Sequence, residues 1–220
     1  MKKTVFLGLL VILMTFGFIG CDVDDESDEN YNRGTPGLRY SHSWNYCSVS
    51  MGTATATDMV IPAVCPERHD VKAIQTGGFK ASGTNSYPAA ANITSVIIPN
   101  TVTQISAEAF ADCANLTSVI IGNNVEIIDS AAFDACTNLL EIKIPASVYA
   151  INRWAFSSCT SLTRVTFEGN ISWASLDTTA FGQSGWSGYG YIGDLRSKYL
   201  NGGIGTYTRD VDGTIWTKQP

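Results

Sequence analysis

Basic residues and histidines are scarce in this sequence. Among its 220 residues, 14 are Lys or Arg, 20 are Asp or Glu and only 2 are His. The formal charge is −6. Without Lys2 and Lys3 the net charge is −8. Six acidic residues between Asp22 and Glu29 carry −6 of this charge, so residues 30–220 carry only −2. Residues 30–220 therefore offer no basic surface, which excludes nucleic acid as a partner.

The sequence also lacks the residue patterns of common catalytic centres. His42 and His69 do not form a pair suited to a catalytic metal, and no serine stands in a nucleophile elbow. The run 188–193 spells G-x-G-x-x-G, but the residues before it do not predict the strand that a dinucleotide site requires. We therefore expect no enzyme, no cofactor and no bound metal.

A single long apolar run occurs, from Thr4 to Gly20, directly after Lys2 and Lys3. A charged start followed by an apolar run is typical of a secretory signal, and the run is slightly short for a membrane-spanning helix. Its end, Phe18-Ile19-Gly20-Cys21, resembles the lipobox of bacterial lipoproteins. That resemblance implies cleavage before Cys21 and acylation of its thiol. An ordinary signal peptide with an incidental cysteine is the alternative.

The residues after this signal are strongly acidic. We predict that 1–20 is the signal and that 21–30 is a solvated tether, because a run of like charges repels itself. The run lacks the glycine and the distant glutamate of a calcium loop. A calcium site is therefore not expected.

The middle of the chain repeats every 23 residues. Apolar residues recur at fixed positions in the columns Phe110/Phe133/Phe156, Cys113/Cys136/Cys159, Ala109/Ala132/Ala155, Ile105/Ile128/Ile151, Val102/Val125/Val148, Leu116/Leu139/Leu162, Val96/Val119/Ile142/Val165 and Ile98/Ile121/Ile144/Phe167. One such unit cannot bury its apolar face alone, whereas stacked units share a continuous core. The period therefore predicts a solenoid.

An upstream unit fits the same pattern with an insertion. Val71, Ile74 and Phe79 precede their equivalents by 31 residues, and the turn-rich residues 82–91 hold the extra eight. A degenerate last unit ends near Phe181. We assign the solenoid to residues 59–181 and expect about five stacked parallel strands, which Pro99 and Pro145 help to terminate.

The repeat L-T-S-V-I-I-(P/G)-x-x-V-x-x-I-x-x-x-A-F-x-x-C resembles the BspA-type leucine-rich repeat of bacterial surface proteins. Residues 93–167 match closely, with Gly122 for proline, Arg153-Trp154 and Phe167 as departures. The resemblance implies a leucine-rich-repeat solenoid, with a parallel β-sheet on its concave face and irregular or short helical convex segments. It also implies a secreted or surface location, and protein binding or adhesion without a particular ligand.

The six cysteines fall into three groups. Cys21 is the expected lipid attachment site, and we expect the repeat column Cys113, Cys136 and Cys159 to be buried and reduced. We expect Cys47 and Cys65 to form a disulfide in an exported protein, and the alternative is that both are free. A zinc site is not expected from the column, because a column spreads its members instead of gathering them.

Both ends of the solenoid need caps. We assign residues 31–58 to an N-terminal cap in which 53–57 could form a strand, and residues 182–220 to a C-terminal cap. Asp194 is a good helix N-cap, and Gly202 follows as a stop signal. Beyond it, 205–209 and 214–217 flank Asp212-Gly213 and predict a hairpin. The rings of Trp186, Tyr189 and Tyr191 either cover the end of the core or contact a sugar or peptide.

The residues between core positions of each strand are expected to face outward. They form two columns, Ser95/Ser118/Glu141/Arg164 and Val60/Ile97/Ile120/Lys143/Thr166. Exposed branched apolar residues suit a partner, although strand propensity alone could also explain them. We therefore expect a lipid-anchored protein of the cell envelope, on the outer membrane or cell surface, whose sheet face binds a host matrix or envelope protein. A structural envelope spacer without a dedicated ligand is the alternative.

Overall fold

The structure is a computed structural model that describes residues 34–182, 194–211 and 213–220. Its elements follow along the chain in the order β1 (Arg39–Ser43), β2 (Tyr46–Ser50), β3 (Asp58–Val60), β4 (Asp70–Ile74), the 3₁₀ helix Pro88–Asn92, β5 (Ser95–Ile97), β6 (Gln104–Ile105), β7 (Ser118–Ile120), β8 (Ile127–Ile128), β9 (Glu141–Ile144), β10 (Ala150–Ile151), β11 (Arg164–Phe167), α1 (Leu195–Gly202), β12 (Gly205–Thr208) and β13 (Thr217–Lys218).

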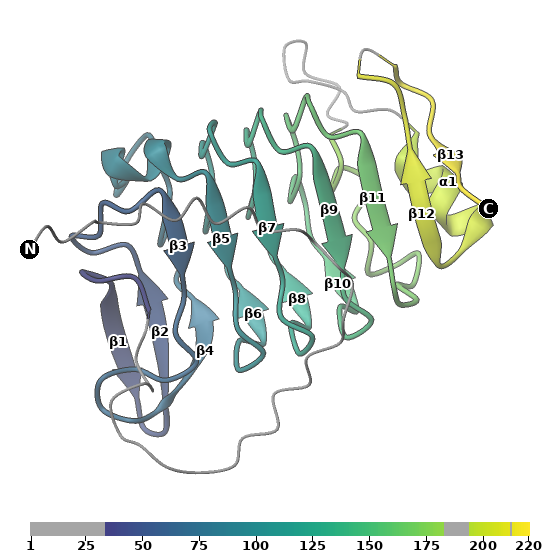
Figure 1. Cartoon of the computed structure of the whole chain (residues 1–220). Helices are drawn as coiled ribbons and strands as arrows, with labels where there is room; N and C mark the ends of the chain where they lie inside the picture. The colour runs from purple at the N-terminus through teal and green to yellow at the C-terminus, as the bar shows by residue number, and fades with distance from the viewer. Residues whose placement is uncertain (1–33, 183–193, 212) are drawn as a thin grey trace, which may run out of the picture.

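Five parallel strands, β3, β5, β7, β9 and β11, stand side by side along the molecule (Figure 1). The last four begin at residues 95, 118, 141 and 164, so the 23-residue period of the sequence is the period of the structure. The pairing register also follows the period, with Val96 opposite Val119 and Val165 opposite Ile142. The predicted leucine-rich-repeat solenoid is confirmed.

A second row of parallel strands lies beside the first. It consists of β2, β4, β6, β8 and β10, of which the last three are only two residues long (Figure 1). Each short strand ends in a buried isoleucine, Ile105, Ile128 or Ile151. The sequence showed this apolar column but did not predict a second sheet, because two residues are too few for an alternating pattern to reveal a strand.

The segments that return on the convex side are irregular. Each of the three central repeats places two residues other than glycine in the left-handed region, with φ of 55° to 62°; they are Glu108, Asp112, Ala131, Ala135, Trp154 and Ser158. Backbone hydrogen bonds nevertheless join successive repeats here, for example from the Phe133 N–H to the Ala155 carbonyl at 2.8 Å. Within residues 34–182, the one short helix is the 3₁₀ helix Pro88–Asn92, which overlaps the insertion 82–91.

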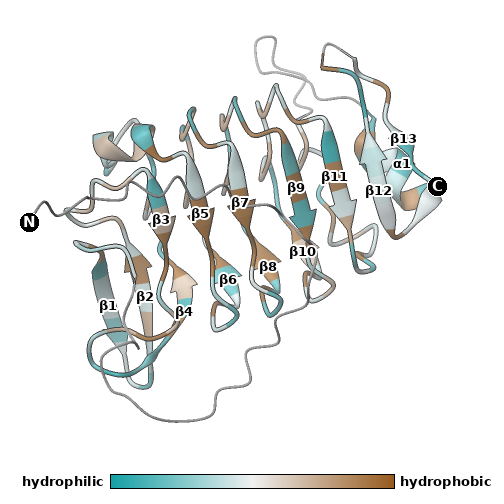
Figure 2. Ribbon diagram, viewed as in Figure 1, coloured by the Kyte–Doolittle hydropathy of each residue, from teal (hydrophilic) through white to brown (hydrophobic). Residues whose placement is uncertain are grey.

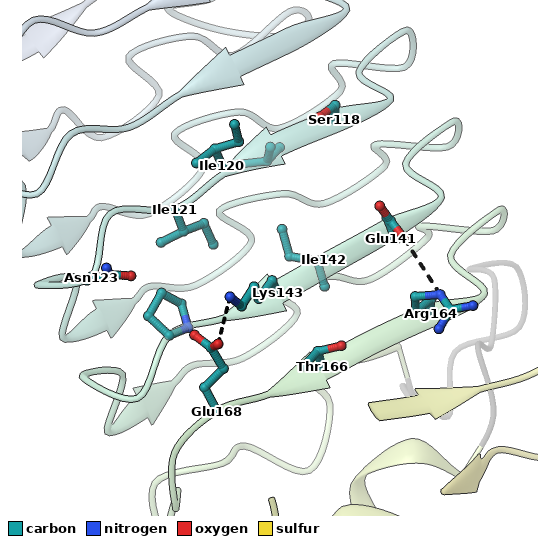
Figure 3. A pocket seen from close by; sticks show the side chains of 12 residues that line it. Ser118, Ile120, Ile121, Asn123, Glu141, Ile142, Lys143, Arg164, Thr166 and Glu168 are labelled. Atoms are coloured by element: carbon teal, nitrogen blue, oxygen red, sulfur yellow. Dashed lines mark ion pairs between the residues drawn. The ribbon is translucent and has the colours of Figure 1, made fainter. Parts of the chain in front are cut away.

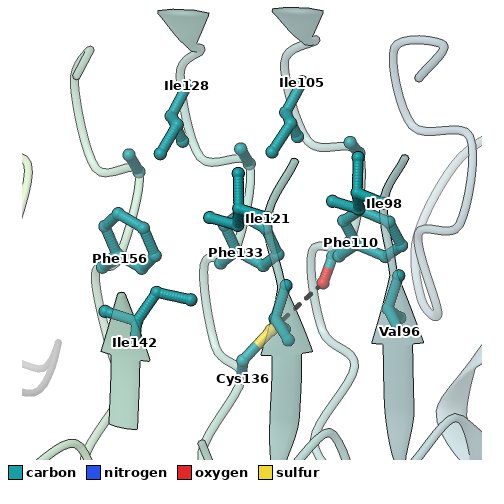
Figure 4. Packing of buried hydrophobic residues seen from close by; sticks show 14 of the residues in the cluster. Val96, Ile98, Ile105, Phe110, Ile121, Ile128, Phe133, Cys136, Ile142 and Phe156 are labelled. Carbon is teal, nitrogen blue, oxygen red and sulfur yellow. Dashed lines mark hydrogen bonds between the residues drawn. The ribbon is translucent and has the colours of Figure 1, made fainter. Parts of the chain in front are cut away.

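Aromatic rings form a continuous column through the core. The rings of Phe79, Phe110, Phe133, Phe156 and Phe181 stack with centroids 5.1 to 5.3 Å apart and interplanar angles of 5° to 17°. Figure 4 shows three of these rings between the isoleucine column of the second sheet and the inward residues of the first. Stacked rungs therefore share one core instead of separate ones.

The N-terminal end is an antiparallel hairpin. β1 pairs with β2, and β2 extends the second sheet by pairing in parallel with β4. The expected strand at 53–57 was wrong. Gly52 turns the chain with φ of 56°, and the Thr53 N–H donates to the Gly37 carbonyl at 2.9 Å, so this stretch folds back instead of extending.

The C-terminal end contains the predicted helix and two strands. Leu195 and Tyr199 of α1 are buried, and Gly203, one residue later than expected, caps the helix with φ of 70°. β12 pairs antiparallel with β11 and β13. The predicted tight hairpin was wrong in its second strand, because β13 begins only at Thr217. Arg209 holds the wider connection by donating to the carbonyls of Val211 and Gly213.

Candidate protein-binding face

The outward residues of β5, β7, β9 and β11 form one face, which we call the sheet face. Burial alternates along each strand, so that Val119 points inward while Ser118 and Ile120 point outward. Ile97 is 43% and Ile120 54% exposed. The eight sequence-predicted face residues are all partly or fully exposed: Ser95, Ile97, Ser118, Ile120, Glu141, Lys143, Arg164 and Thr166.

The register brings these residues together in columns. Val60, Ile97 and Ile120 lie opposite one another across β3, β5 and β7, so the N-terminal half of the face carries an apolar stripe. Lys143 and Thr166 continue the same column across β9 and β11. Figure 2 shows the change along the sheet: β5 and β7 are white to brown, whereas teal hydrophilic residues appear among the brown ones on β9.

The C-terminal half of the face is charged. Arg164 lies 3.7 Å from Glu141, and Lys143 lies 2.7 Å from Glu168 (Figure 3). Because these pairs are largely exposed, each contributes only about 0–1 kcal/mol to stability. Their larger consequence is that both signs of charge stand beside the apolar stripe and are available to a partner.

The first row of strands is interrupted between β7 and β9. β7 pairs with β5, and β9 pairs with β11, but within the described residues no backbone ladder joins β7 to β9. One repeat earlier, a backbone hydrogen bond does join neighbouring strands at the corresponding position: the Ile98 N–H donates to the Ile120 carbonyl at 2.9 Å. Two strand edges inside the row are therefore left unpaired.

A hollow of about 690 Å³ opens at this interruption. Its lining comes from β7, β9, β11 and the turns that follow them, and includes Ser118, Val119, Ile120, Ile121, Asn123, Glu141, Ile142, Lys143, Pro145, Arg164, Thr166 and Glu168 (Figure 3). The inward residues Val119 and Ile121 are 8% and 7% exposed, against 1% each for Val96 and Ile98 in the previous repeat. The floor of the hollow therefore reaches solvent.

Gly122 lies just after β7, next to the interruption. A Cβ at this position would lie 2.4 Å from the Pro99 carbonyl oxygen, so the third strand approaches the second more closely than a side chain allows. The sequence showed Gly122 as a departure from proline, and it stands between Ile121 and Asn123, which line the hollow.

The cysteines occupy two different environments. Cys47 and Cys65 form a disulfide that joins β2 to the loop before β4. Cys113, Cys136 and Cys159 are free and buried, and each thiol donates to a backbone carbonyl, as Cys136 does to Phe110 at 3.3 Å (Figure 4). Burial raises the pKa of the Cys113 thiol to about 12 and raises the pKa of the other two as well. These three thiols are therefore poor nucleophiles.

Several predicted features lie outside the described residues. They are the signal 1–20, Cys21, the acidic tether 21–30, and the aromatic and glycine-rich run 183–193. Among the residues that are described, no helix combines the length and the apolar character needed to cross a bilayer.

Residues 80–187 match the BspA type leucine-rich repeat region, in six copies. The repeat region of this chain belongs to that family. Leucine-rich repeats of this type are interaction or surface repeat modules, and the match gives no indication of an enzyme. No curated protein matches the chain.

Two solved leucine-rich repeat proteins have a similar fold. The T. pallidum leucine-rich repeat protein is 21% identical with a TM-score of 0.52, over 63% of this chain and 59% of that one. A leucine-rich repeat protein from Bacteroides capillosus is 27% identical with a TM-score of 0.51, over 60% of this chain and 95% of that one. This chain thus spans little more than half of the T. pallidum protein, and the two likenesses show the fold.

Proposed function

We propose that this chain is an exported, lipid-anchored and non-catalytic module that binds a protein ligand through its sheet face. The observation that carries the proposal is the apolar stripe Val60, Ile97 and Ile120, which ends at an open hollow lined by charged side chains. The fold does not need branched apolar side chains at outward positions, whereas a partner can bury them.

The chemistry of the face indicates what the ligand offers. An apolar side chain would enter the hollow beside Ile120, where it would displace water from a side chain that is 54% exposed. Carboxylates or cationic groups beside it would exchange with the Lys143–Glu168 pair at the rim. We therefore expect a ligand segment with an apolar anchor next to polar residues.

A crosslinking pull-down with residues 30–220 tests this function. The prey is host matrix extract and, separately, the bacterium's own envelope proteins. The double substitution Ile97→Glu/Ile120→Glu should lose the partner that the parent captures, because it places two carboxylates on the apolar stripe. Ile215→Glu is the matched control, since Ile215 is 69% exposed and lies outside the sheet face.

The outcomes separate the functions. If the double variant loses the captured partner while the parent and Ile215→Glu keep it, binding through the sheet face is supported. Equal capture by all three proteins would show that the face lies elsewhere. If a folded parent captures nothing from either extract, the structural envelope spacer is the better description.

The lipid anchor has its own test, because the resemblance of residues 18–21 to a lipobox is the whole support for it. Cells that express the full chain would be supplied with a labelled fatty acid. The chain should carry the label, and Cys21→Ala should not. Label on the Cys21→Ala chain would contradict the anchor without affecting the binding proposal.

A further inference from the structure

The N-terminal end gathers metal-ligating side chains that are scattered in the sequence. His42, Cys47, Cys65 and Glu67 each direct a ligand atom into one cluster, and these four atoms all lie within 4.8 Å of one another. Neither the repeat pattern nor the sheet face uses any of them. The spacing of the cysteines, 18 residues apart, gave no indication of the cluster.

Two separate elements build the cluster. His42 and Cys47 are cross-strand neighbours in the β1–β2 hairpin, and the pairing of β2 with β4 shifts register just after Cys47. Such an irregularity re-aims a side chain. Cys65 and Glu67 come from a tight turn, in which the Arg68 N–H donates to the Cys65 carbonyl at 2.9 Å.

The distance between His42 and Cys65 suits a small cation, whereas the Glu67 oxygen, now hydrogen-bonded to His42, would have to withdraw to about 3.3 Å from that nitrogen to share the ion. The Nε2 atom of His42 lies 3.7 Å from the Cys65 sulfur and 2.5 Å from a Glu67 oxygen. A tetrahedral zinc ion with bonds of about 2.3 Å to sulfur and 2.0 Å to nitrogen separates those two ligands by about 3.5 Å. Breaking the Cys47–Cys65 bond would let the two sulfurs move apart to comparable separations.

The set of ligands selects the class of ion. Two thiolates, an imidazole and a carboxylate are the ligands of zinc and similar borderline cations, whereas calcium and magnesium take oxygen ligands. Four protein ligands fill a tetrahedral site and leave no open position, as in structural zinc sites. The site is therefore suited to holding segments together and not to catalysis.

We propose that the dithiol form of this chain binds one zinc-class divalent cation through His42, Cys47, Cys65 and Glu67. A dithiol reductant supplies two electrons and two protons to the disulfide and is itself oxidised to a disulfide. The cation then displaces one proton from each thiol. In either state the hairpin stays joined to the turn before β4, by the disulfide when oxidised and by the cation when reduced.

The experiment compares oxidised and reduced full-length chain, purified in detergent with Cys21→Ser in every variant. Cys47 and Cys65 are 0% and 2% exposed, so reduction of their disulfide is verified by alkylation and mass spectrometry of the unfolded chain before zinc is added. After removal of the reductant under nitrogen and dialysis against zinc, bound metal is measured by atomic emission. The reduced chain should hold one zinc per chain, and the oxidised chain none.

Cobalt(II) then reports the ligands. The reduced chain should show a thiolate-to-cobalt charge-transfer band and the intense visible bands of a four-coordinate site. His42→Ala and Glu67→Gln should each lower the zinc affinity by about tenfold or more. Glu126→Gln, which changes an exposed carboxylate elsewhere, should not change it.

Three results would overturn the assignment. They are absence of zinc from the reduced chain, equal zinc in both redox states, and a cobalt spectrum without the thiolate band. His69 provides a further check, because its Nδ1 atom is buried without a hydrogen-bond partner close to this cluster. If His69→Ala loses affinity while Glu67→Gln does not, His69 and not Glu67 is the fourth ligand. Should a variant fail to fold by circular dichroism, the comparison of the two redox states still decides.

Discussion

Phe133→Ala should be among the most destabilising substitutions in this chain. The side chain is fully buried, and its ring stacks on Phe110 and Phe156 with both centroids 5.3 Å away. Truncating a buried Phe to Ala costs about 3–5 kcal/mol, and each stacked ring contributes about 0.5–1.5 kcal/mol beyond its buried area. Because rungs flank the ring on both sides, the void cannot collapse, and we expect a loss of about 4–5 kcal/mol.

Phe79→Ala is the matched comparison. Phe79 is equally buried, but it begins the column and stacks on one ring only, Phe110 at 5.1 Å. Its truncation should therefore cost less than that of Phe133 by the contribution of one ring pair, about 0.5–1.5 kcal/mol. Phe133→Leu keeps most of the volume but loses both ring pairs, so it should cost about 1–3 kcal/mol.

Urea denaturation of residues 30–220 measures these differences. Circular dichroism and tryptophan fluorescence should give the same midpoint, and the denaturant slope should stay unchanged between variants, so that midpoints convert to free energies of unfolding. If Phe79→Ala costs as much as Phe133→Ala or more, the ring column does not act as a continuous stabilising unit, and the reasoning fails.

Three further predictions concern single sites. Gly122→Ala should destabilise the fold by about 1–3 kcal/mol, because its Cβ would overlap the Pro99 carbonyl, and an unchanged urea midpoint would contradict this. Burial, followed by the charge of a neighbouring aspartate, raises the pKa of Asp134. The folded state therefore holds that proton more tightly than the unfolded state, and stability is lost as the pH rises through the folded pKa. Asp134→Asn should thus be more stable than the parent at neutral pH, and the two proteins should be equally stable at about pH 3, below the ordinary pKa of an aspartate. A stability difference that does not change with pH would show that the charge of Asp134 is not its cause. Ala135→Gly should leave the stability unchanged or raise it, since a φ of 56° strains alanine. Ala132→Gly, at a fully buried position of ordinary conformation, should lower the stability by about 1 kcal/mol. Equal urea midpoints for the two variants would contradict this difference.

The repeated part of the fold could be predicted from the sequence because the repeat determines its own neighbours. Once Phe110, Phe133 and Phe156 recur at a fixed interval, stacking the units in register is the arrangement that buries all of them together. The alternation of Ser118, Val119 and Ile120 then assigns one face to solvent. The outward columns of the sheet face follow from the same alternation.

Features that break the period could not be predicted in this way. A periodic sequence predicts an unbroken ladder, so the interruption between β7 and β9 was not visible in the sequence. Phe167 departs from the branched aliphatic residue of the repeat and has a clear structural role. The centroid of its ring, at the end of β11, lies 4.0 Å from that of Tyr199 in α1, so the two rings pack the helix against the end of the solenoid. The cluster of His42 and Glu67 lies outside the repeats, where no pattern reports which segments meet.

The interruption also bears on the choice between a binding module and a spacer. A spacer gains from every ladder hydrogen bond, each contributing about 0.5–1.5 kcal/mol, and the repeats before and after the gap make theirs. This chain protects other edges of the same row, because the Thr35 N–H donates to the Val60 carbonyl beside β3 and β12 covers β11. Unpaired edges in the middle of the row, next to exposed Ile120, therefore reduce stability without serving a spacer. They leave backbone donors and acceptors beside a hollow that has both apolar and charged lining, and this combination favours a ligand at the sheet face.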